Sequence, residues 1–220
     1  MRIGILGTGM VGRALAARAA EVGHQVTVGA RSADSPTLSA FAELEVVTGS
    51  FAEAAAAGDL VINATHGLAS PAALELAGRE NLAGKTLLDV ANELHLAEGL
   101  PPRPLAAPDN SLGLRIQREF TEARVVKALH TMTNQVMVHP ELVPGDHVAF
   151  LSGDDAGAKE EVRVLLRTFG WRDAQFVDLG GIETAVHTEQ LMGLWLCVAM
   201  GRGWTAPPFN WALHAADRPA

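Results

Sequence analysis

Three glycines near the start of the chain have the spacing of a phosphate-binding turn. Gly7, Gly9 and Gly12 follow an apolar run at residues 2–6 and precede an alanine-rich segment at residues 13–22, so they join a predicted strand to a predicted helix. In such a turn the first glycine permits a tight bend, the second lets backbone approach a pyrophosphate, and the third allows close packing of helix on strand. Free N–H groups at the helix start then favour an anion. We therefore predict dinucleotide contacts from the whole turn: Gly7, Thr8, Gly9, Met10, Val11 and Gly12. A glycine-rich structural turn without a ligand is the alternative.

The end of the second predicted strand, at residues 25–28, bears on which dinucleotide binds. Sites for NAD commonly place Asp or Glu there to accept from the ribose 2′-hydroxyl. This strand ends instead in Gly29, Ala30, Arg31 and Ser32. Arg31 can clamp a 2′-phosphate with its planar guanidinium, and Ser32 can add a hydroxyl contact. The sequence thus favours NADP(H) over NAD, with a solvated surface arginine as the alternative interpretation of Arg31.

Two further strand ends are expected at the same crevice, because ligands bind at the carboxyl ends of parallel strands. Small and polar residues there would let a ribose and a nicotinamide pass, and the candidate contacts are Ala64, Thr65, His66, Ala91 and Asn92. His66 is compatible with a ligand contact, an acid or a plain loop residue. Because no partner accompanies it in the sequence, the loop residue is favoured.

The composition excludes several classes of protein. The chain has 220 residues, of which 48% are hydrophobic, and a net charge of -8, which disfavours nucleic-acid binding. Its one cysteine, Cys197, excludes an internal disulfide and a cysteine-rich zinc site, and we expect no metal. The absence of tyrosine excludes a mechanism with a tyrosine acid. The longest apolar run, residues 191–200, is about half of what a membrane span needs, so we expect a cytoplasmic protein without membrane partners.

Strands and helices alternate along the chain, which predicts a Rossmann-type, doubly wound α/β fold with a mostly parallel sheet. Strands are predicted at residues 2–6, 25–28, 46–47, 59–63, 85–90, 124–129, 147–151 and 174–177. Helices are predicted at residues 13–22, 51–57, 71–77, 111–120, 156–169 and 182–200, the last a long C-terminal helix. Four prolines predict an irregular loop at 99–109. We interpret residues 1–220 as one domain, with a dinucleotide-binding half at 1–129 and a substrate-side half at 130–220.

The sequence resembles the NADPH-dependent F420 reductases, also called F420:NADP oxidoreductases, over nearly its whole length. The motifs that carry the resemblance are GILGTGMVG, GARS, DLVINAT, LLDVAN, VVKALHTM and FLSGDDAGAKEEVRVLLRTFGW. This family is broadly related to the N-terminal domain of pyrroline-5-carboxylate reductase. The resemblance implies hydride transfer between nicotinamide C4 and C5 of the deazaflavin F420, in which catalysis consists mostly of positioning two rings. We also expect a homodimer.

The VVKALHTM motif supplies the candidates for the deazaflavin side. Similar archaeal enzymes carry a histidine beside the deazaflavin at the place of His130, and many bacterial relatives have asparagine there. The resemblance implies a positioning or hydrogen-bonding role in catalysis for His130. A strand-end histidine satisfied by backbone is the alternative. Thr131, Thr133 and Asn134 are expected to line the same crevice, with Asn134 near the nicotinamide amide. Candidate cations for the acidic tail of F420 are Lys127, Arg115, Arg118 and Arg202.

Two departures from the family pattern leave other functions open. Residues 191–193 read Leu-Met-Gly where relatives tend to have Tyr-Leu-Pro, and Glu93 follows Asn92 where proline is usual. The first alternative is an F420H2- or NADPH-dependent reductase of an imine or a conjugated C=C bond in a small metabolite. The second is a non-catalytic NADP(H)-binding sensor. A β-hydroxyacid dehydrogenase is disfavoured, because too little chain remains for its long helical domain.

Overall fold

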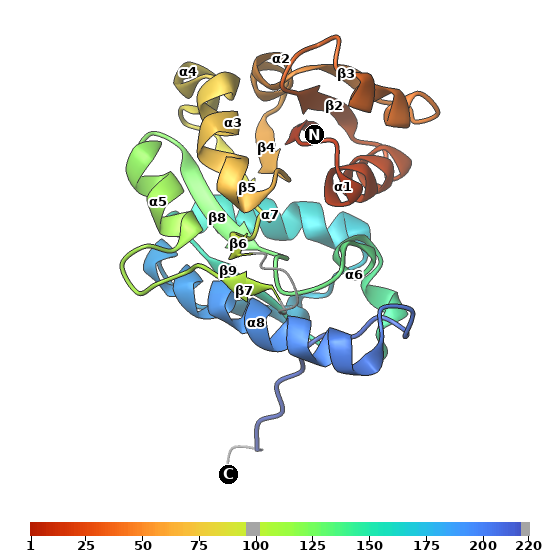
Figure 1. Ribbon diagram of the computed structural model, residues 1–220, viewed down its shortest axis with the longest axis vertical. Coiled ribbons are helices and arrows are strands. Elements are labelled where there is room, and N and C mark those ends of the chain that lie inside the picture. Colours follow the sequence, from red (N-terminus) through yellow and green to blue (C-terminus); the bar gives the residue numbers. More distant parts are fainter. Residues whose placement is uncertain (96–101, 217–220) are drawn as a thin grey trace.

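The computed structural model describes residues 1–95 and 102–216 and shows one large sheet covered by helices (Figure 1). The strand order is β10-β9-β8-β5-β4-β1-β2-β3. The strands are β1 (Arg2–Leu6), β2 (Gln25–Ala30), β3 (Val47–Ser50), β4 (Leu60–Asn63), β5 (Thr86–Asp89), β8 (Arg124–Ala128), β9 (Ala149–Ser152) and β10 (Phe176–Asp178). Neighbouring strands are parallel except β8 and β9, which are antiparallel. The predicted Rossmann-type, mostly parallel α/β fold is confirmed.

The helices cover both faces of this sheet. They are α1 (Met10–Glu21), α2 (Phe51–Ala57), α3 (Ser70–Ala77), α4 (Arg79–Leu82), α5 (Leu112–Glu119), α6 (Asn134–Val138), α7 (Ala156–Phe169) and α8 (Ala185–Arg202). One core cluster packs α1, α6 and α7 against one face, and a second packs α2, α3 and α5 against the other. The first cluster joins residues from both sides of position 129, so the division into two halves stays an interpretation.

The predicted elements agree with the structure in place, and their ends differ for local reasons. The bounds of α7 are as predicted, because Asp155 caps its start through the Ala158 N–H and Gly170, in a left-handed conformation, ends it. Helix α1 begins at Met10, three residues earlier than predicted, because the glycine turn itself forms its first turn. The last predicted helix is a 3-10 turn at Ile182–Thr184 followed by α8.

Helices α4 and α6 and the pairing of β6 (Leu94–His95) with β7 (Arg103–Pro104) were not predicted, and one expected loop lies partly outside the described residues. Helix α6 follows β8 closely and was missed, because five residues leave too short a pattern to read. Of the expected irregular loop, residues 99–101 lie outside the described part. Its described part contains β7, which pairs with β6. Among the described residues, none of the helices has the length and apolar character to span a bilayer.

Candidate functional site

Two adjoining cavities lie at the carboxyl ends of β1, β2, β4 and β5, where the strand order reverses between β1 and β4. The larger has a volume of about 890 Å³ and the smaller about 310 Å³. Four residues line both: Gly9, Ala64, Thr65 and His66. The two cavities therefore form one continuous crevice over the switch point of the sheet, where open α/β sheets bind their ligands.

The three glycines of the turn are required for different reasons. Gly7 has φ 121°, and a Cβ there would lie 2.5 Å from the Ala64 carbonyl oxygen. A Cβ on Gly12 would lie 2.1 Å from the carbonyl oxygen of Gly7. Gly9 is different, because a Cβ there would meet nothing within 4 Å. The packing of the chain explains Gly7 and Gly12 but leaves the space at Gly9 open to a ligand.

The start of α1 offers donors at this open position. Gly9 is the N-cap of the 12-residue helix, no side chain caps its N–H groups, and no acidic residue stands in its first turn. Uncapped N–H groups together with the helix dipole favour an anion. The turn therefore fits the pyrophosphate of a dinucleotide, as the sequence predicts.

The far end of the larger cavity carries the residues predicted to select the nucleotide. Arg31 and Ser32 line it, and so does Asp34, which the sequence analysis missed. The Ser32 Oγ donates a 2.5 Å hydrogen bond to Asp34 Oδ1, and this bond holds the pKa of the Asp34 carboxyl below its ordinary value. This wall of the cavity therefore carries both a guanidinium and a carboxylate. Asp34 was missed because it lies past the strand end, in the loop before the 3-10 turn at Pro36–Phe41.

Two helices give the larger cavity an apolar wall. Phe51 comes from α2, Ala72, Ala73 and Leu76 come from α3, and all of them face the cavity. Such a wall suits the faces of a planar base. Sequence reasoning missed these residues because apolar positions on helices look the same whether they face a core or a ligand.

The smaller cavity is mostly apolar, with a few amides. Seven apolar side chains line it: Met10, Val11, Ala64, Val90, Ala91, Met132 and Met137. Of its polar lining residues, Asn92 donates from Nδ2 to the His130 carbonyl oxygen at 2.7 Å, and Asn134 lies with Nδ2 3.5 Å from the Met10 carbonyl oxygen. The predicted residues Met10, Val11, Ala91, Asn92 and Asn134 thus meet in one cavity, although they come from three separate segments.

Three predicted residues of the second half do not line these two cavities. Thr131 is buried, and Thr133 caps α6 through the Val136 N–H and lines a separate small cavity next to Trp195. His130 is 1% exposed, and its ring nitrogens lie near the backbone of Ala128 and Thr188 in a geometry too poor for a standard hydrogen bond. Burial, with the nearby charge of Lys127, holds the pKa of His130 well below its ordinary value, so the ring is neutral. In this arrangement His130 reaches the crevice through its carbonyl group, and contact of its ring with a deazaflavin stays a prediction.

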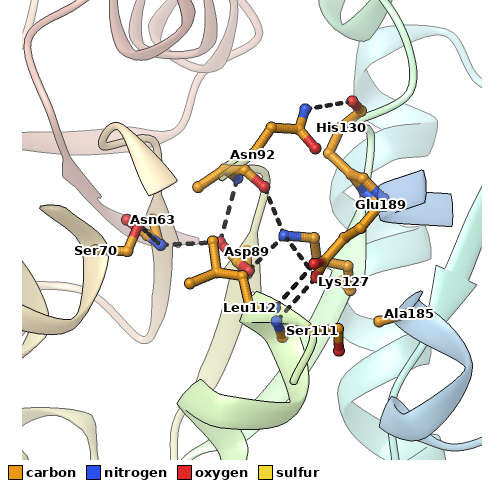
Figure 2. Close-up of polar contacts among 12 residues, drawn as sticks. Asn63, Ser70, Asp89, Asn92, Ser111, Leu112, Lys127, His130, Ala185 and Glu189 are labelled. Carbon is orange, nitrogen blue, oxygen red and sulfur yellow. Dashed lines mark hydrogen bonds and ion pairs between the residues drawn. The ribbon is translucent and has the colours of Figure 1, made fainter. Parts of the chain in front are cut away.

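Directly beneath the crevice lies a sealed cluster of charges, shown in Figure 2: Asp89, Lys127 and Glu189. The Lys127 Nζ lies 2.8 Å from Asp89 Oδ2 and 3.4 Å from Glu189 Oε1, and none of these three side chains is more than 3% exposed. Burial alone lowers the pKa of Lys127, but the two carboxylates outweigh it and raise that pKa, so the ammonium stays charged.

This cluster holds the backbone that lines the smaller cavity. Lys127 Nζ donates to the Ala91 carbonyl oxygen at 2.5 Å, and Asp89 Oδ1 accepts from the Ala91 N–H at 3.2 Å. Asp89 Oδ1 also accepts from Asn63 Nδ2 at 2.8 Å, and Asn63 Oδ1 accepts from the Thr65 hydroxyl at 2.6 Å. The ends of β4 and β5 are therefore fixed relative to each other by buried hydrogen bonds.

Glu189 extends the same cluster to two helices. Its oxygens accept from the Leu112 N–H at 2.8 Å and the Gly113 N–H at 2.9 Å, which caps the start of α5 from α8 (Figure 2). Lys127 is thus not available as a cation for an acidic ligand, which corrects that expectation. Its signal in the sequence was a lysine in the middle of the apolar strand β8.

The other three cations expected to meet an acidic ligand have protein partners as well. Arg115 pairs with Glu93 at 2.6 Å. Arg118 donates to the Asp109 carbonyl oxygen at 3.1 Å. Arg202 lies over the Phe209 ring and donates to the Pro207 carbonyl oxygen at 3.2 Å. None of the three lines either cavity of the crevice.

Comparisons with known proteins concern the family and the fold. Residues 2–93 match the family described as NADP oxidoreductase, coenzyme F420-dependent. A solved structure from Arthrobacter sp. FB24, provisionally described as an F420-dependent NADP reductase, is 43% identical, with a TM-score of 0.88 over 97% of this chain and 99% of that one. No curated protein matches the chain.

More distant structures share the fold. An imine reductase from Myxococcus stipitatus, in complex with NADP+, is 16% identical with a TM-score of 0.65, over 91% of this chain and 62% of that one. An imine reductase from Streptomyces aurantiacus is 19% identical with a TM-score of 0.62, over 93% of this chain and 62% of that one. At such identities the likeness concerns the fold alone.

Proposed function

This chain belongs to the family of F420-dependent NADP oxidoreductases, and we propose that it transfers a hydride between NADP(H) and the deazaflavin coenzyme F420. The observation that carries the proposal is the continuous crevice formed by the two cavities. The larger has a phosphate-binding turn, a guanidinium and an apolar wall, which fits the adenosine side of the nucleotide. The smaller, largely apolar and reached past Gly9 and Thr65, fits the two reacting rings.

The chemistry asks little of the protein beyond positioning. When bound, NADPH would supply a hydride from nicotinamide C4 to C5 of the deazaflavin, and solvent or a nearby polar group would supply the proton taken up at N1. The α1 N–H groups hold the phosphates, and Arg31 holds the 2′-phosphate. Met10, Met132 and Met137 line the smaller cavity and offer adaptable thioether side chains for the reacting rings to pack against. Asn92 and Asn134 supply amide groups that orient the rings.

A spectroscopic assay tests the proposal. The protein is mixed with NADPH and F420, and the absorbance of oxidised deazaflavin is followed with time. We expect the absorbance to fall only when all three are present. The matched variant is Gly9→Val, which adds a side chain where the protein itself has free space, so it should fold normally but obstruct the phosphates.

Each negative result has a definite meaning. Binding of NADPH without loss of deazaflavin absorbance would overturn F420 as the second substrate and favour a reductase of an imine or a conjugated C=C bond. Binding without turnover of any acceptor would favour a sensor. Equal rates for wild type and Gly9→Val would overturn the placement of the phosphates.

We also infer that two copies associate through the outer face of α8. Leu194, Cys197 and Met200 are exposed on that face, and Trp204 follows the helix with 66% of its surface exposed. Exposed apolar side chains that recur along one helix are typical of an interface between proteins. Sedimentation equilibrium should give twice the mass of the chain for wild type and a lower mass for Leu194→Glu; a monomeric wild type overturns the inference.

A further inference from the structure

A carboxylate shares the nucleotide-selecting wall of the larger cavity with Arg31. Asp34 and Ser32 line this wall with it, beyond the end of β2. All three residues are exposed, so packing does not fix the Asp34 side chain. What fixes it is the 2.5 Å hydrogen bond that Ser32 Oγ donates to its Oδ1.

The guanidinium and the carboxylate favour different ligands. An arginine favours a 2′-phosphate, with which it forms paired charge-assisted hydrogen bonds. A carboxylate repels that phosphate and accepts a hydrogen bond from an unmodified 2′-hydroxyl. Because the hydrogen bond from Ser32 lowers the pKa of Asp34, this side chain is ionised at neutral pH. The same bond engages the Ser32 hydroxyl proton, which is then not free for a phosphate oxygen.

The loop that carries Asp34 is tied to the glycine turn. The Thr8 hydroxyl donates to Thr37 Oγ1 at 2.8 Å, and Ser35 Oγ lies 3.0 Å from the same oxygen. Thr8, Ser35 and Thr37 all line the larger cavity. These hydroxyl contacts hold the Asp34 loop against the part of the cavity that receives the ribose.

Building on the proposed function, we infer that Asp34 is a specificity-determining residue that narrows the preference of this site for NADP(H) over NAD(H). The carboxylate weakens the hold of Arg31 on a 2′-phosphate and offers an acceptor to the 2′-hydroxyl of NAD(H). Arg31 alone would give a strong preference for NADP(H). Arg31 together with Asp34 gives a site that also accepts NAD(H).

Calorimetric titration of the whole protein with NADP+ and with NAD+ tests this inference. Asp34→Asn keeps the shape of the side chain and removes its charge. We expect the ratio of NADP+ affinity to NAD+ affinity to rise about tenfold, as expected for removing one like charge near a partly solvated phosphate. The matched control is Glu43→Gln, an exposed residue outside the lining of this cavity, which removes the same net charge. We expect the control to change the ratio by less than about twofold.

A second variant separates charge from hydrogen bonding. Ser32→Ala should weaken NADP+ binding more in the Asp34→Asn background, where the hydroxyl is free for a phosphate oxygen, than in the wild-type background, where Asp34 engages it. An unchanged ratio in Asp34→Asn, or an equal change in the Glu43→Gln control, overturns the inference.

The titrations contain no F420, so their result is independent of the proposed reaction. A protein that binds both nucleotides but does not reduce F420 would overturn the proposed function and leave the role of Asp34 standing. If the protein reduces F420, but the ratio of NADP+ affinity to NAD+ affinity is the same in wild type and Asp34→Asn, the proposed function stands and the role of Asp34 is overturned. Absence of binding of either nucleotide to the wild type would overturn both.

Discussion

Two groups of charged side chains lie at the crevice, one beneath it and one on its wall, and they differ in access to water. Asp89, Lys127 and Glu189 are sealed beneath the smaller cavity, with at most 3% of any of these side chains exposed. Arg31 and Asp34 stand on an open wall of the larger cavity. In the sealed cluster every charged group has fixed protein partners. Arg31 and Asp34, in contrast, are accessible to a ligand that enters the larger cavity. The first can hold backbone in place, and the second can discriminate between ligands.

The difference follows from the free energy of desolvation. A buried ion costs several kcal/mol unless its partners are in place, so a sealed cluster tolerates few substitutions. An exposed ion keeps its water and is screened, so the same substitution costs little stability. We therefore expect changes in the sealed cluster to appear in stability, and changes in the open cluster to appear in ligand affinity.

The largest expected effect is that of Lys127→Met. It leaves Asp89 and Glu189 as buried carboxylates without a cation, so we expect the free energy of unfolding to fall by about 3–5 kcal/mol. Urea unfolding measures it. The control is Lys85→Met, because Lys85 is only partly buried and donates to the backbone carbonyls of Ala55 and Ala56.

The triple variant Asp89→Asn, Lys127→Met, Glu189→Gln sharpens this test. It removes the uncompensated charges, so it should recover part of the lost stability. A loss below about 1 kcal/mol for Lys127→Met would show that the cluster is not sealed in solution, and the contrast between the two clusters would then fail.

The second effect concerns affinity. Arg31→Ala should weaken NADPH binding by about 10- to 100-fold, the value of one or two charge-assisted hydrogen bonds, and should leave NADH binding nearly unchanged. Unfolding in urea should be indistinguishable from that of wild type. Equal losses for both nucleotides would remove Arg31 from the 2′-phosphate site, and a large loss of stability would contradict the placement of Arg31 on an open wall.

The open site was more predictable from sequence than the sealed cluster. The glycine turn and Arg31 are local in sequence, since a strand, a turn and a helix bring them to the cavity with no long-range information. Lys127 and Glu189 meet only because β8 and α8 pack together, and no sequence period links them. Their one signal was a lysine in an apolar strand, which the sequence analysis interpreted as a candidate ligand for an acidic tail.

His130 is a second residue whose surroundings could not be predicted from the sequence. The resemblance to the family places it beside the deazaflavin, and its position at the end of β8 is consistent with that. What the sequence did not reveal is the direction of the ring, which depends on the packing of α8 through Thr188. Leu129, with φ 65°, turns the chain just before it, and a non-glycine residue in that conformation gives no sequence signal.

The third effect is a pH dependence that comes from His130. Its pKa is well below the ordinary value in the folded protein, so the unfolded chain binds a proton that the folded one does not once the pH falls below about 6.5. Stability from this group is therefore present above that pH and is lost as the pH falls, by up to about 1.4 kcal/mol per pH unit.

Unfolding free energies of wild type and His130→Asn between pH 7.5 and 5.5 measure this contribution. The slope should be shallower in the variant, whatever its absolute stability. His66→Asn, at an exposed position in the crevice, serves as the control and should keep the wild-type slope. Parallel curves for wild type and His130→Asn would mean that the ring is solvated in the folded protein, which would contradict its burial.

The smallest expected effect on stability comes from the partly exposed ion pairs of Asp178. Asp178 is 36% exposed and pairs with Lys159 at 2.7 Å and with Arg163 at 3.1 Å. Partial burial raises the pKa of Asp178, but hydrogen bonds from Lys159 and the Gly180 N–H outweigh it and lower that pKa. Its stabilisation is therefore present above the unfolded pKa of about 3.9 and is lost as the pH falls through the lower folded value.

Asp178→Asn should lower the free energy of unfolding by about 0.5 kcal/mol at pH 7, as for other solvated ion pairs, and the difference from wild type should vanish in acid. Asp146→Asn, which breaks the more exposed pair with Arg172, should cost less still. A cost for Asp178→Asn as large as that of Lys127→Met would mean that burial does not rank these clusters, and the contrast between the sealed and the open site would lose its physical basis.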